Sequence, residues 1–231
     1  YSTNGTGDQI FSGVISGPGN ITRSALDDNT GGTTILSGAN TFTLGATLDD
    51  GALGLGADTI LSGLVIISSP IGTGTFEWTG NSSLFAHGAP RTLANFVYLN
   101  GVRDAKITGT NALTFAGFMD VGTVSKAFTI DSTAPTTITG VMTNTAPLIK
   151  GGAGVLVLSG PNQNSGGWTV TNGTLLVNGT SGSGDIVVTN TGILGGTGTI
   201  AGAVTVASSG TLAPGATIGT LTISSNLTLI G

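Results

Sequence analysis

Few residues in this chain could carry out acid–base or metal chemistry, and they are scattered. His87 is the one histidine and cysteine is absent, so a zinc site of His and Cys ligands cannot form. The acidic pairs Asp27–Asp28 and Asp49–Asp50 could supply the two carboxylates of a glycoside hydrolase. However, adjacent residues on a strand point to opposite faces, and both pairs precede turns. We therefore interpret the pairs as turn formers and His87 as a solvated loop residue.

We predict no catalytic, cofactor-binding or metal-ligating residue. Calcium remains a minor alternative, because Gly182-Ser183-Gly184-Asp185 is half of a known calcium-binding repeat phrase, although it occurs once.

Aromatic and basic side chains gather between residues 76 and 128. Such side chains anchor protein interfaces, and a partner surface could be built from Trp78, His87, Arg91, Tyr98 and Arg103. The alternative is that wide coils need large residues to fill their interior. We favour the interior interpretation and keep the partner surface as the second.

The composition is that of an ordered β protein with little charge. Charged residues make up 7% of the 231, the net charge is −5, and Gly and Thr are abundant. A net negative charge argues against a nucleic-acid partner, which needs a basic surface. The longest apolar run, Leu64 to Ile67, is too short to span a bilayer, so we expect no membrane insertion.

The elements that must position these residues are short strands in a regular repeat. A phrase of glycine turn and strand recurs about every eighteen to nineteen residues, at Gly173-Thr174-Leu175, Gly192-Ile193-Leu194 and Gly210-Thr211-Leu212. A short fixed period of this kind is typical of stacked β-coils. It predicts an all-β parallel β-solenoid of about twelve coils. Apolar residues should point inward, among them Leu175, Val188, Leu194, Val206 and Leu212.

A longer phrase also repeats. Ser37-Gly38-Ala39-Asn40 returns as Ser159-Gly160-Pro161-Asn162, and at the same offset Thr47 matches Thr169 and Leu53 matches Leu175. These residues, with Asn172-Gly173-Thr174-Leu175-Leu176-Val177, resemble the autotransporter-associated β-strand repeat. The resemblance covers residues 11–56 and 138–231. It implies a right-handed parallel β-helix displayed at the surface of a bacterium or outside it.

The predicted organisation is a single β-solenoid over residues 1–231. A first repeat phrase spans 11–56, irregular and aromatic-richer coils span 57–137, and a second repeat phrase with a short-period tail spans 138–231. The chain begins at Tyr1 without methionine, which we expect of a processed chain or a fragment.

Both predicted ends are apolar and carry no polar cap, namely Ile10 and Phe11 at one end and Leu227, Leu229 and Ile230 at the other. An open solenoid end is a template for another strand, and a head-to-tail contact that does not close gives a filament. The sequence therefore favours a non-enzymatic extracellular structural protein whose partner is itself. The alternatives are a passenger-like adhesin that binds a carbohydrate or matrix protein and, third, a polysaccharide-degrading enzyme.

Overall fold

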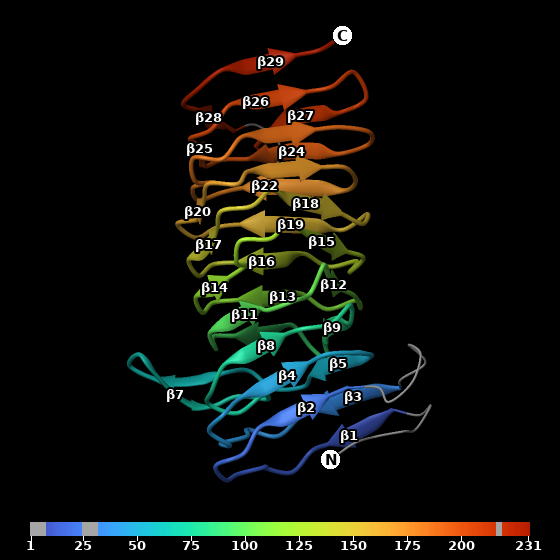
Figure 1. Cartoon of the computed structure of the whole chain (residues 1–231), viewed down its shortest axis with the longest axis vertical. Helices are drawn as coiled ribbons and strands as arrows, with labels where there is room; N and C mark the ends of the chain where they lie inside the picture. Colours follow the sequence, from blue (N-terminus) through green and yellow to red (C-terminus); the bar gives the residue numbers. More distant parts are fainter. Residues whose placement is uncertain (1–7, 25–31, 216–218) are drawn as a thin grey trace.

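A computed structural model describes residues 8–24, 32–215 and 219–231, and these form a β-solenoid without helices. Figure 1 shows the strands stacked as successive turns of one rod, with the two termini at opposite ends. The described residues thus contain no helix that is long and apolar enough to cross a membrane.

Three parallel sheets run along the rod. Sheet A has eleven strands, in the order β1 (Gln9–Phe11), β3 (Thr33–Leu36), β5 (Ala52–Leu55), β9 (Ser83–Ala86), β12 (Asp104–Ile107), β15 (Lys126–Ile130), β18 (Leu148–Gly151), β21 (Trp168–Val170), β23 (Ile186–Val188), β26 (Val204–Val206) and β29 (Leu227–Leu229). Sheet B has seven: β2 (Ile21–Arg23), β4 (Ala46–Leu48), β8 (Phe76–Trp78), β11 (Val97–Leu99), β14 (Met119–Asp120), β17 (Met142–Asn144) and β20 (Gln163–Asn164). Sheet C also has seven: β10 (Arg91–Leu93), β13 (Leu113–Phe115), β16 (Thr136–Ile138), β19 (Val155–Leu158), β22 (Thr174–Val177), β24 (Ile193–Gly196) and β27 (Thr211–Pro214).

Two smaller sheets complete the fold. A short parallel pair, β25 (Thr199–Ile200) and β28 (Thr222–Ile223), lies in the last turns. An antiparallel hairpin of β6 (Ile60–Ser62) and β7 (Val65–Ser68) projects sideways from the rod (Figure 1). The hairpin is strongly apolar on its surface, because Leu64 at its tip is fully exposed and Ile60, Val65 and Ile67 are each at least half exposed.

The prediction of a parallel β-solenoid is confirmed, and its turns number about ten where the period predicts about twelve. The difference comes from the length of the turns. Trp168 pairs with Ile186, eighteen positions on, as the tail period predicts, whereas Asp104 pairs with Ala127, twenty-three positions on. The longer turns carry three strands, one in each sheet, and the eighteen-residue turns have room for two main strands.

The interior is a set of apolar ladders, as period-two alternation predicts. Leu156, Leu175 and Leu194 pair in register through sheet C and are completely buried. Val188 and Val206 are buried in sheet A. Leu212 continues the sheet C ladder but is half-buried, because β27 is the last strand of that sheet.

The two long repeat phrases build the same local unit in different sheets. The first phrase forms β3 in sheet A, and the second forms β19 in sheet C. In both, the asparagine of the phrase is buried at a corner and its side-chain amide donates to backbone carbonyls: Asn40 to Pro70 at 2.6 Å, and Asn162 to Thr180 at 2.9 Å. A buried amide with backbone partners fixes the corner, since leaving these groups unpaired would cost free energy.

A lysine interrupts the apolar interior of sheet A. Lys150 faces inward between Phe128 and Val170 and is completely buried. Its ammonium donates to the carbonyls of Gly151, Gly152 and Asn172 at 2.8–3.0 Å. Burial lowers the pKa of Lys150 to about 8 from 10.5, although the negative charge of Asp131 partly opposes the shift.

A first prediction concerns the register of the interior. Leu194→Asp should lower the free energy of unfolding by about 3–5 kcal/mol, because it buries an unpaired carboxylate. Urea denaturation followed by circular dichroism measures the loss. Thr205→Asp places the same charge at an outward position of β26 and should cost little. Equal losses for the two variants would contradict the inward placement of Leu194.

A second prediction concerns the stability cost of adding a side chain where neighbouring turns lie close together. Gly167 and Gly63 both have positive φ, at 79° and 62°. A Cβ at Gly167 would overlap the backbone of Asp185 on the next turn, whereas a Cβ at Gly63 would meet nothing within 4 Å. We expect Gly63→Ala to cost only the left-handed backbone term of about 1–2 kcal/mol, and Gly167→Ala to cost clearly more. Similar melting temperatures for the two variants would contradict this.

A third prediction follows from Lys150. Between pH 8 and 10.5 the unfolded chain keeps the proton that the folded chain has lost, so stability should rise with pH across this window. The full rise is on the order of 3 kcal/mol. Lys150→Met should lack the Lys150 contribution, as should Lys150→Arg, whose side chain does not titrate here, and only the rise that comes from the lowered pKa of Lys126 should remain. Lys106→Met removes a lysine on the surface and should keep the rise; thermal unfolding against pH decides between these outcomes.

Candidate functional site

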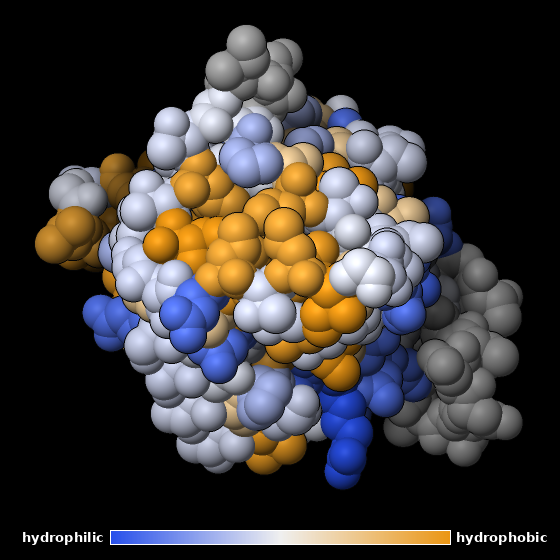
Figure 2. Space-filling model, turned by 90° about the horizontal axis from the view of Figure 1, so that it is seen from above, coloured by the Kyte–Doolittle hydropathy of each residue, from blue (hydrophilic) through white to orange (hydrophobic). Residues whose placement is uncertain are grey.

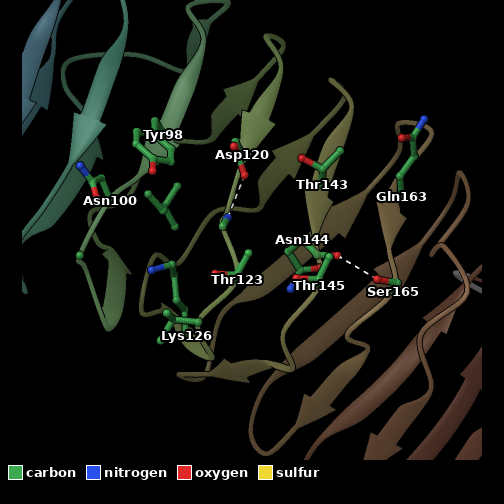
Figure 3. Close-up of a pocket in the computed structure, with 14 residues that line it drawn as sticks. Tyr98, Asn100, Asp120, Thr123, Lys126, Thr143, Asn144, Thr145, Gln163 and Ser165 are labelled. Atoms are coloured by element: carbon green, nitrogen blue, oxygen red, sulfur yellow. Dashed lines mark hydrogen bonds between the residues drawn. The ribbon is translucent and has the colours of Figure 1, made fainter.

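A polar groove of about 480 Å³ lies on the outer face of sheet B. It spans four successive turns, and its side chains form two rows (Figure 3). The first row lies on the strands themselves: Tyr98, Asp120, Thr143 and Gln163. The second row lies at the corner that follows the strands: Asn100, Thr123, Thr145 and Ser165. The groove is therefore a product of stacking, since neighbours within a row come from neighbouring turns.

The first row is fixed by the register of sheet B. Tyr98 pairs with Asp120, Asp120 with Thr143, and Thr143 with Gln163. Paired residues point to the same side of a sheet, and adjacent strands lie about 4.8 Å apart. Tyr98 and Gln163 are thus roughly 14 Å apart along the rod, with one polar side chain at each step between them.

Two side chains beside the second row are buried yet retain unused hydrogen-bonding capacity. Lys126 is 5% exposed, and in the described part of the chain its ammonium donates one hydrogen bond, to the carbonyl of Val102 at 3.0 Å. Burial and the nearby charge of Arg103 lower the pKa of Lys126. Asn144 is 4% exposed, and its Oδ1 has no hydrogen-bond partner among the described residues. Both side chains occupy inward positions of their strands, so they belong to the interior corner behind the groove.

Aromatic rings gather at the Tyr98 end of the groove. Phe96 stacks on Tyr98 with ring centroids 6.4 Å apart and an angle of 9°, and Phe118 lies 5.6 Å from Phe96. Phe96 and Phe118 are 39% and 44% exposed, which is unusual for phenylalanine. The rings hold Tyr98 in one orientation and extend an apolar surface beside the polar groove.

The partner surface predicted from the sequence is not one surface. Trp78 is completely buried, with its Nε1 donating to Ser82 Oγ at 2.8 Å, so its assignment to a surface is corrected. Its ring fills the interior beside Phe76, as the alternative interpretation requires. His87 lies at the corner that follows β9, and Arg91 begins β10 and donates to the carbonyl of His87. Tyr98 lies on sheet B, and Arg103 is exposed at the corner before β12.

The acidic residues form no arrangement suited to hydrolysis within the described residues. Asp50 accepts a hydrogen bond from the amide of Gly51, and Asp49 accepts one from Thr79, in keeping with a turn. Asp27–Asp28 lies outside the described residues. Asp120 is the one carboxylate that lines the groove, whereas glycoside hydrolysis uses two. The described residues also hold no cluster of three or more His, Asp or Glu side chains.

Sequence reasoning found Tyr98 but missed the rest of the groove. Asp120, Thr143 and Gln163 stand at unremarkable positions 20 to 23 residues apart, and only the register shows that they are neighbours. The irregular period of residues 57–137 was the one sequence signal for the groove. Turns longer than the eighteen-residue repeat have room for an additional strand, and therefore for an additional sheet.

The residues predicted at the two ends do lie in the outermost strands of sheet A. Ile10 and Phe11 are in β1, Leu227 and Leu229 are in β29, and Ile230 follows β29. Figure 2 looks down on the C-terminal end, where hydrophobic side chains spread across the middle of the face. At the N-terminal end a mostly apolar hollow of about 420 Å³ opens between Phe11, Ile15, Ile21 and Leu36.

In a comparison with known protein families, residues 148–177 match the model of the passenger-associated-transport-repeat family. This segment runs from β18 to β22 and overlaps the second repeat phrase predicted from the sequence. No curated protein and no solved structure matches the chain significantly. The match and the stacked parallel turns together fit an autotransporter passenger-type repeat protein, which confirms the resemblance read from the sequence.

Proposed function

We propose that this chain is a non-enzymatic structural segment of a bacterial surface or extracellular rod, and that its end turns stack on those of a second copy. The repeat match indicates a bacterial surface or extracellular protein, and proteins of this repeat and fold are typically non-enzymatic. The observation that carries the stacking proposal is the apolar surface of the first and last described turns.

The C-terminal face exposes apolar side chains at interior positions of the last strand of sheet A. Leu227 and Leu229 pair with the buried Val204 and Val206 and therefore occupy inward positions. They are nevertheless 45% and 67% exposed, and Ile230 beside them is 52% exposed. Covering them would remove apolar surface from water at about 25 cal/mol per Å².

The N-terminal face offers a complementary surface. Its hollow is lined by Phe11 and Leu36, which pair in register at the start of sheet A. Because β1 and β29 are the two end strands of the same parallel sheet, a second copy placed head to tail would extend sheet A. Such a contact joins unlike faces, so it propagates instead of closing.

Charge offers little resistance to this contact. Asp185 is the one charged residue between positions 151 and 231. Like-charge repulsion between the C-terminal turns of one rod and the next rod is therefore small.

The fourth prediction is that the chain forms end-to-end rods as its concentration rises. Sedimentation velocity should show growing, elongated species, and negative-stain images should show rods longer than one solenoid. Leu227→Lys combined with Leu229→Lys should reduce this association, because it places two charges on the apolar face.

Thr228→Lys is the matched control, since Thr228 lies on the same strand but alternates to the outward side. It should leave association largely intact. Rods of a single length at every concentration, lateral pairs in place of end-to-end ones, or equal effects of the inward and outward lysines would each overturn the proposal.

A further inference from the structure

We infer that the groove on sheet B binds an oligosaccharide that runs along the rod axis from Tyr98 to Gln163. This inference is independent of end stacking, because the groove lies on the side of the rod and the open faces lie at its ends.

The shape of the groove favours an extended ligand. Tyr98, Asp120, Thr143 and Gln163 follow one another over three strand spacings, or roughly 14 Å. The groove is about 480 Å³ and spans four turns of the rod, so an elongated ligand can follow it. A compact metabolite would leave most of this row without contacts.

The chemistry of the lining fits a ligand with many hydroxyl groups. The two rows present hydroxyl, amide and carboxylate groups (Figure 3). A sugar hydroxyl both donates and accepts, so it can pair with each of these groups.

Tyr98 adds the apolar contact that a sugar ring also offers. Its ring lines one end of the groove and is held there by stacking on Phe96. A fixed aromatic ring presents a flat apolar face at little cost in side-chain entropy. The groove therefore combines two rows of polar groups with one aromatic ring. A sugar is complementary to it, because its hydroxyl edges are polar and its ring faces are apolar.

The same features disfavour an extended peptide or a lipid. A peptide usually docks on a sheet by pairing with a free strand edge. Within the groove, β11, β14 and β17 are each paired on both sides. The one strand edge there lies at β20, the last strand of sheet B, and a peptide paired there would lie beyond Gln163 and away from Tyr98 and Asp120. An acyl chain would leave the polar rows desolvated and unpaired.

The fifth prediction tests the full 231-residue chain on a printed array of neutral, amino-sugar and uronic-acid oligosaccharides, followed by calorimetry with the best binder. We expect at least one oligosaccharide to bind, with longer chains binding more tightly than the disaccharide. Tyr98→Ala should weaken binding roughly tenfold, and Thr143→Ala and Gln163→Ala should weaken it by smaller factors.

Thr169→Ala is the matched control for Thr143→Ala, because Thr169 occupies an outward position on β21 of sheet A, outside the groove. It should bind like the unmodified chain, and all four variants should melt at nearly the same temperature. Absence of binding across the array, binding that Tyr98→Ala and Thr143→Ala leave unchanged, or preference for extended peptides over sugars would overturn the inference.

Discussion

Hydrogen bonding between one turn and the next positions every other feature of this protein. In sheet A ten consecutive strand pairs are parallel and in register, from β1 to β29. Each pair fixes which residues of the next turn face inward, since a slip by one residue would exchange the two faces. Interior ladders such as Leu156, Leu175 and Leu194 are therefore a consequence of backbone pairing, and their burial in turn stabilises the register.

The same constraint explains why this chain can carry so little charge. A residue in the middle of the stack contacts the turns before and after it, so core and surface are both repeated along the rod. Many outward strand positions carry threonine, such as Thr143, Thr169 and Thr205, because its branched side chain suits a strand and its hydroxyl can hydrogen-bond to water. The completely buried cation Lys150 is tolerated because three corner carbonyls accept hydrogen bonds from its ammonium group. Burial still lowers the pKa of Lys150.

Sequence reasoning reached the fold because the period and the alternation are local signals. The inward placement of Leu175 and Leu194 followed directly from the eighteen-residue phrase. Sequence reasoning could not assign strands to sheets. The same repeat phrase forms β3 in sheet A and β19 in sheet C. The phrase determines the geometry of its own corner, but the turns below it determine which sheet the strand joins. Trp78 was misplaced for a related reason. In an irregular segment the sequence does not show whether an aromatic side chain points inward or outward. For Trp78 this became clear only from the register of β8 with β11.

The groove and the hairpin both lie where the turns are longer than the eighteen-residue repeat. An eighteen-residue turn such as that from Trp168 to Ile186 contributes to sheets A and C and leaves no strand for sheet B. The turns of 20 to 23 residues between β11 and β20 supply that third face, and the groove lies on it. The longest step, from Ala52 to Ser83, contains the apolar hairpin. Because stacked turns share one register, extra residues can lengthen a corner or add a strand without disturbing the ladders, so surface features can vary while the core is preserved.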